Sequence, residues 1–137
     1  MKKLPIAIIC FLLVFMSSCK KEEPVGTVVH SRTFTVAASQ WVWNSANYLY
    51  YVDLPYPEIT SALLPNAAVV GYKQASNPEL WLSMPNTFYP IIGSSLSYTW
   101  EIAYVRAGTV RIRFVWSDSR QQAPTSTEVF RIVAVGK

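Results

Sequence analysis

The sequence predicts an all-β fold: a two-sheet antiparallel sandwich of about seven strands, immunoglobulin-like or of a related Greek-key type. From Cys19 onward, 46 of 119 residues are Val, Ile, Thr, Tyr, Phe or Trp, which favour strands. They occur in short runs between Pro, Asn, Ser and Gly residues. The whole chain is 51% hydrophobic and 15% charged, so it can bury enough apolar surface to fold. A closed barrel is the alternative architecture.

Seven runs are expected to form the strands of a single domain spanning residues 27–137. They cover residues 27–37, 47–54, 67–74, 79–84, 96–106, 109–117 and 127–136. The last run has apolar side chains on both faces, with Phe130 and Ile132 on one side and Val129 and Val133 on the other. A strand that is apolar on both faces is expected in the middle of a sheet rather than at its edge.

The runs 96–106 and 109–117 read as a hairpin, and its register can be chosen from the side-chain pattern. A two-residue loop would set Ile102 against Arg113, which mixes the faces. A three-residue loop with Gly108 in the left-handed conformation gives four apolar pairs. It also sets Glu101 against Arg113 and Ala103 against Arg111 on a wetter face. We therefore predict the second register, with the apolar pairs Tyr104–Val110, Ile102–Ile112, Trp100–Phe114 and Tyr98–Trp116.

Residues 57–64 are expected to form one short helical turn that connects the sheets. Pro57 and Pro65 bracket this segment, and proline is tolerated in the first turn of a helix but blocks its continuation. Ile59 and Leu63 are expected to face inward.

The first 18 residues are predicted to be a signal peptide. Lys2 and Lys3 precede an apolar run from Leu4 to Met16, which is too short to cross a bilayer that needs about 20 residues. Removal of this segment also removes Cys10 and two lysines, so the side-chain charge falls from +4 to +2. The mature chain then carries no disulfide and no thiol apart from Cys19.

The sequence Ser-Ser-Cys at 17–19 resembles the lipobox of bacterial lipoproteins, although Met16 stands where that pattern more often has leucine. The resemblance implies that Cys19 is the first mature residue and carries acyl chains, several of which give stable membrane anchoring. The alternative is a secreted protein cut near Ser18.

Residues 19–26 are expected to form a charged tether. Lys20, Lys21, Glu22 and Glu23 follow Cys19, a pattern similar to the signal that exports Bacteroidota lipoproteins to the outer face of the outer membrane. A lipoprotein that faces the periplasm is the alternative.

The domain itself resembles small outer-membrane lipoproteins of the Bacteroidota. The resemblance rests on Trp41, on the strand Tyr48–Leu54 and on the motifs at 57–60, 68–72, 81–85 and 130–133. It covers nearly the whole mature domain. These motifs are structural, so the resemblance implies a fold and a location and assigns no catalytic residues.

Little in the sequence points to catalysis, and no cofactor is expected. His30 is the single histidine, the five glycines form no phosphate-binding loop, and no Gly-x-Ser-x-Gly motif is present. The domain's carboxylates show no spacing that converges on a cleft. A side-chain charge of +2 also gives no reason to expect a nucleic-acid partner.

The aromatic residues are the remaining candidates for a binding site. Trp41 and Trp43 lie two residues apart on an extended segment and so point the same way, as a platform for a sugar ring would require. Trp81 and Tyr89 are further candidates. Capping of the sandwich core is the alternative role for Trp41 and Trp43.

The sequence therefore favours a lipid-anchored, non-enzymatic binding or assembly module at the outer membrane, with a glycan or protein partner at the cell surface. A carbohydrate-binding module with a tryptophan platform and a small cell-surface hydrolase are the alternatives.

Overall fold

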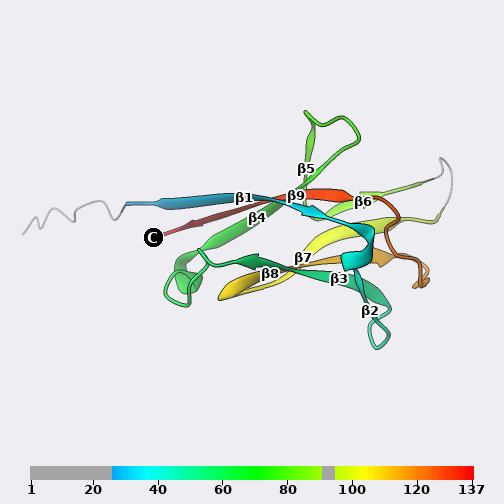
Figure 1. Ribbon diagram of the computed structural model, residues 1–137, viewed down its shortest axis with the longest axis horizontal. Helices are drawn as coiled ribbons and strands as arrows, with labels where there is room; N and C mark the ends of the chain where they lie inside the picture. The colour runs from blue at the N-terminus through cyan, green and yellow to red at the C-terminus, as the bar shows by residue number, and fades with distance from the viewer. Residues whose placement is uncertain (1–25, 91–94) are drawn as a thin grey trace, which may run out of the picture.

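The computed structural model describes residues 26–90 and 95–137 and shows two antiparallel sheets that pack face to face (Figure 1). The predicted signal peptide, Cys19 and nearly all of the tether lie outside the described residues. In strand order, one sheet contains β1 (Val28–Val36), β9 (Glu128–Gly136), β4 (Ala68–Gln74) and β5 (Trp81–Ser83). The other contains β2 (Val42–Asn44), β3 (Leu49–Tyr56), β8 (Gly108–Trp116), β7 (Tyr98–Arg106) and β6 (Asn86–Phe88).

The predicted all-β sandwich is confirmed, and the two separate sheets rule out the closed barrel. All seven predicted strands are present, and β9 lies between β1 and β4 as its two apolar faces indicated. Val28 pairs with Gly136, so the start of β1 and the end of β9 lie side by side (Figure 1).

Two short strands, β2 and β6, were not predicted. The predicted run 79–84 ends early as β5, and the chain then passes through the cis peptide Met84–Pro85 into β6 of the other sheet. Proline has no N–H to donate to a ladder, so the crossing occurs where pairing stops.

The helical turn expected over 57–64 is wrong in its extent. The segment forms hydrogen-bonded turns followed by the 3-10 helix η3 (Leu64–Asn66), and a second 3-10 helix, η2, spans Ala38–Gln40. A segment this short cannot offset the cost of nucleating an α-helix. Ile59 nevertheless faces inward and is fully buried, as predicted.

The hairpin of β7 and β8 combines both registers that the sequence allowed. Far from the turn, the predicted pairs Tyr98–Trp116, Trp100–Phe114 and Ile102–Ile112 are present. At the turn, Arg106 pairs with Thr109, so the predicted three-residue loop is wrong and two residues connect the strands. Gly108 has φ of 74°, the left-handed conformation that was expected.

A β-bulge at Ala103 joins the two registers. Ile102 pairs with Ile112 and Tyr104 pairs with Arg111, which leaves Ala103 as the extra residue. The predicted pairs Tyr104–Val110 and Ala103–Arg111 are therefore wrong. Beyond the bulge, Val105 takes the core-facing place opposite Val110, and Tyr104 turns to the outer face of the sheet.

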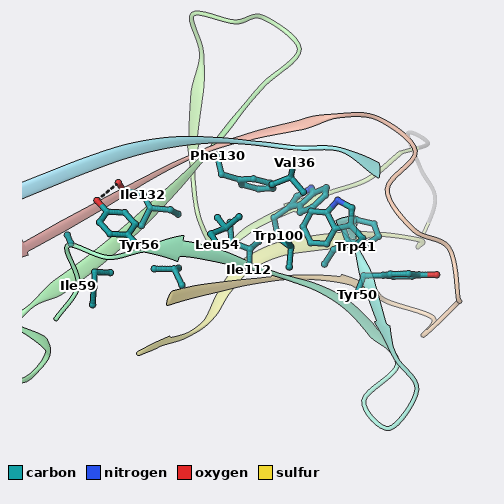
Figure 2. Packing of buried hydrophobic residues seen from close by; sticks show 14 of the residues in the cluster. Val36, Trp41, Tyr50, Leu54, Tyr56, Ile59, Trp100, Ile112, Phe130 and Ile132 are labelled. Carbon is teal, nitrogen blue, oxygen red and sulfur yellow. Dashed lines mark hydrogen bonds between the residues drawn. The ribbon is translucent and has the colours of Figure 1, made fainter. Parts of the chain in front are cut away.

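The core is aromatic at one end of the sandwich and aliphatic in the middle (Figure 2). The Trp100 ring is 2% exposed and lies 4.5 Å from the Phe114 ring and 5.5 Å from the Phe130 ring, measured between centroids. At the other end, the buried Tyr56 hydroxyl donates a hydrogen bond of 3.2 Å to the Ile132 carbonyl, which links the two sheets.

Candidate functional site

The outer face of the five-stranded sheet carries a cluster of two tyrosines, an aspartate and an arginine, here named the Tyr–Arg cluster. Tyr51 and Asp53 come from β3, Arg111 from β8 and Tyr104 from β7. Val52 and Leu54, the neighbours of Asp53 in β3, are buried, so strand alternation sends Tyr51 and Asp53 outward. Asp53 pairs directly with Arg111 in the register of β3 and β8.

Ion pairing and aromatic stacking hold the Arg111 guanidinium in one orientation. Its Nε and Nη2 donate to the two Asp53 carboxylate oxygens at 2.7 and 2.6 Å. Its Cζ lies 3.8 Å from the centroid of the Tyr51 ring and 4.7 Å from that of Tyr104. The Tyr104 hydroxyl donates to Asp53 at 3.3 Å, which closes the network.

The hydrogen bonds from Arg111 hold the pKa of the Asp53 carboxyl below its usual value, and those bonds raise the pKa of the Arg111 guanidinium. Both side chains therefore stay charged at neutral pH, and the cluster keeps its geometry there.

A groove of about 200 Å³ lies beside the cluster. It is also lined by Asn44 and Asn47 from the β2–β3 turn, which lies at the opposite end of the sandwich from the start of β1 (Figure 1). Asn44 Oδ1 accepts hydrogen bonds from the backbone N–H groups of Ala46 and Asn47, which orders the turn. The remaining lining residues are Leu49, Tyr51, Ala103, Tyr104, Arg111 and Arg113.

The bulge at Ala103 makes this arrangement possible. In a regular ladder Tyr104 would face the core, whereas the extra residue rotates it to the side of Asp53 and Arg111. On the same face, Arg113 and Glu101 form the predicted cross-strand ion pair, with an Nε–Oε1 distance of 2.8 Å. Bulges of this kind re-aim a side chain at the expense of ladder pairing.

Sequence reasoning did not find the Tyr–Arg cluster. A usable signal was present, because Tyr51 and Asp53 occupy outward positions of a predicted strand. The pairing of β3 with β8 and the bulge were both needed to place Arg111 and Tyr104 beside them.

The candidate residues Trp41 and Trp43 do not form an open platform. Trp41 is 7% exposed and packs in the core, with its ring centroid 5.2 Å from that of Trp100 and 6.1 Å from that of Phe130. Trp43 is half-buried and lies 4.9 Å from the Tyr50 ring. This placement corresponds to the core-capping role.

Trp81 and Tyr89 lie elsewhere, so the four candidates do not gather at one site. The half-buried Trp81 belongs to β5 in the four-stranded sheet, and the Arg131 guanidinium carbon lies 4.1 Å from its ring centroid. Tyr89 follows β6 in the other sheet and is 64% exposed.

A second hollow lies at the end of the sandwich, under the segment 122–126. It measures about 180 Å³ and is lined by Tyr98, Trp100, Phe114 and Trp116, of which the last three are at most 9% exposed. Trp116 Nε1 donates to the Gln122 carbonyl at 2.7 Å, and this bond holds the covering segment in place. The rings that line the hollow also pack against one another.

An ion pair lies between the sheets beside this hollow. Lys73 Nζ is 2.7 Å from Glu128 Oε2, and the two side chains are 12% and 13% exposed. Burial, together with the Glu128 charge, raises the pKa of the nearby Tyr98 hydroxyl. Because Lys73 and Glu128 pair with each other, their arrangement indicates a structural role.

Few acidic, histidine or cysteine side chains lie close together in the described part of the chain. Residues 26–90 and 95–137 contain no group of three His, Cys, Asp or Glu side chains placed to hold a metal. His30 lines a shallow hollow with Glu58 and Lys137. Glu58 is the acidic side chain that lines this hollow, and among the described residues no acidic side chain lines the groove beside the Tyr–Arg cluster. The hollow under the segment 122–126, and a neighbouring hollow lined by Lys73 and Ser76, each contain Glu128 as their one described acidic side chain.

Comparisons of the chain with protein-family models, with curated proteins and with solved structures find no match. Within the described part of the chain, no helix is long and apolar enough to span a bilayer.

Proposed function

We propose that this chain is a lipid-anchored, non-enzymatic binding module at the outer membrane, which displays the groove beside the Tyr–Arg cluster at the cell surface. The bulge-dependent cluster is the observation that carries the proposal. Tyrosine and arginine are the residue types that most often dominate binding surfaces, because they offer large contact area and several hydrogen bonds. Ion pairing and stacking hold Arg111 in place before a ligand arrives, which lowers the entropic cost of binding.

The position of the groove is consistent with an anchor at Cys19. The tether would enter the domain at the start of β1, and the β2–β3 turn beside the groove lies at the other end of the sandwich (Figure 1). A ligand could then reach the groove from the side away from the membrane.

The carbohydrate-binding alternative remains a proposal, with the groove in place of the tryptophan platform. Asn44, Asn47 and the arginines offer hydrogen bonds suited to sugar hydroxyls. The hydrolase alternative has less support, because a carboxylate pair of the glycosidase kind needs two acidic residues in one cleft.

The binding role is tested on glycan and peptide arrays with the mature chain and its Tyr104→Ala variant. We expect wild-type signals that fall at least tenfold in the variant, because Arg111 loses one of its two stacking partners. Tyr72→Ala is the matched control, since Tyr72 pairs with Arg131 in the other sheet, and it should bind as wild type. A signal that Tyr104→Ala leaves intact would reject the groove, and silent arrays would reject the binding role.

The anchor is tested separately by Cys19→Ala in the full-length chain. We expect the wild-type chain to fractionate with membranes and the variant to move to the soluble fraction, because the acylated side chain is lost. Cys10→Ala is the control, since this cysteine leaves with the predicted signal peptide, and it should still fractionate with membranes. Membrane retention of the Cys19→Ala protein would contradict lipidation.

A further inference from the structure

The groove presents hydrogen-bond donors and positive charge to a ligand. Two guanidinium groups and two side-chain amides line it, and no carboxylate does. Asp53 and Glu101, which pair with these arginines, are not among the lining residues. Arg106 does not line the groove, but its guanidinium carbon lies 5.5 Å from the centroid of the Tyr104 ring and adds a third positive charge nearby.

The arginines keep donors available for a ligand. A guanidinium has five N–H groups. Asp53 accepts from Nε and Nη2 of Arg111, which leaves the Nη1 donors without an acceptor among the described residues. Glu101 pairs with Nε of Arg113, and no described residue accepts from its terminal nitrogens. A carboxylate accepts two parallel N–H bonds from such a group.

The groove is also small, and its lining combines polar side chains with aromatic and aliphatic ones. Its volume of about 200 Å³ lies below the roughly 300–1,000 Å³ of sites for drug-sized ligands, so it suits a single ring. Leu49 and Ala103 are its aliphatic lining residues, and the others are polar or aromatic. A peptide side chain would find no deep apolar pocket here, whereas a ring that carries hydroxyl groups would meet the Asn44 and Asn47 amides.

We propose that the groove binds an acidic saccharide, with the carboxylate of a uronic acid on Arg111 and Arg113 and the ring hydroxyls on the two asparagines. This inference rests on the proposed binding function and specifies its ligand class. Asp53 holds Arg111 through two nitrogens, whereas Glu101 pairs with Arg113 through Nε alone, and the Arg113 side chain is 40% exposed. Arg113 is therefore the residue that discriminates acidic from neutral rings.

The test is titration calorimetry of the mature chain carrying Cys19→Ala with galacturonic acid oligomers and with galactose oligomers of equal length. We expect the acidic oligomer to bind at least tenfold more tightly, with an affinity that falls as NaCl rises, because exposed charges are screened by salt. Arg113→Gln should weaken acidic binding about tenfold and weaken neutral binding by much less, so that the preference for the acidic oligomer falls. Arg131→Gln, the same substitution on the other sheet, should bind as wild type.

The outcomes separate this inference from the proposed function. Equal affinity for acidic and neutral oligomers would overturn the acidic preference and leave the binding role in place. Preferential binding of glutamate-rich peptides would overturn the saccharide class. Array binding that depends on Tyr104, without any response to acidic oligomers, would overturn the inference alone, and silence in both assays would overturn both.

Discussion

Trp100→Ala is expected to lower the free energy of unfolding by about 3–5 kcal/mol, the range for truncating a large buried aromatic residue. Trp100 is 2% exposed, and its ring contacts the rings of Trp41, Tyr98, Phe114 and Phe130. Figure 2 shows Trp100 beside Trp41 and Phe130. Removal of the indole leaves a cavity between the two sheets, at the point where these rings pack against one another. Urea denaturation followed by circular dichroism measures the effect.

Two further variants keep this prediction testable if Trp100→Ala does not fold. Trp100→Phe retains part of the ring and is expected to shift the urea midpoint by an intermediate amount. Tyr89→Ala removes an aromatic residue that is 64% exposed and is expected to leave the midpoint unchanged. A loss below about 1 kcal/mol for Trp100→Ala would show that this residue does not hold the sheets together.

Glu128→Ala is expected to destabilise the fold by about 3 kcal/mol, at the lower end of the cost of leaving a buried charge unpaired. Lys73 faces the interior, with Nζ 5.4 Å from the Trp100 ring centroid and 5.7 Å from that of Phe88. Those rings attract the ammonium but do not replace the carboxylate that lies 2.7 Å away. Urea unfolding of the wild type and the variant at neutral pH gives the difference.

A double variant separates the ion pair from the packing of its side chains. Lys73→Met with Glu128→Leu is expected to recover most of the loss, because well-packed apolar residues replace buried ion pairs with little cost. Asp118→Ala breaks the exposed pair with Arg120 and serves as the control, with no expected change in the midpoint. If the double variant is as unstable as Glu128→Ala, the unpaired charge is not the cause.

The pattern of apolar and polar residues was enough to predict seven strands, the central place of β9 and the pairing of Glu101 with Arg113. These features depend on residues close in sequence or on one hairpin. β2 and β6 have three residues each and were missed, whereas β5, of the same length, lies within the longer predicted run 79–84. The β-bulge at Ala103 leaves no signature in the pattern of its own strand.

The candidate site was harder to predict because its residues are far apart in sequence. Asp53 and Arg111 are 58 residues apart in sequence and become neighbours because β3 pairs with β8. Polar residues flank Trp41 and Trp43, so the sequence allowed either a surface platform or a role in capping the core. In the structure Trp41 is buried in the core, because burying a large apolar ring stabilises the fold more than leaving it in water does.

By itself, the sequence determined the strand content and the core face of most strands. Those properties follow from local composition and from a side-chain period of two. Only the tertiary structure decided which strands are neighbours outside the β7–β8 hairpin, where Tyr104 points and that Trp41 is buried. Each of these depends on contacts between distant segments, and a single extra residue at Ala103 reverses the face on which every following side chain of β7 lies.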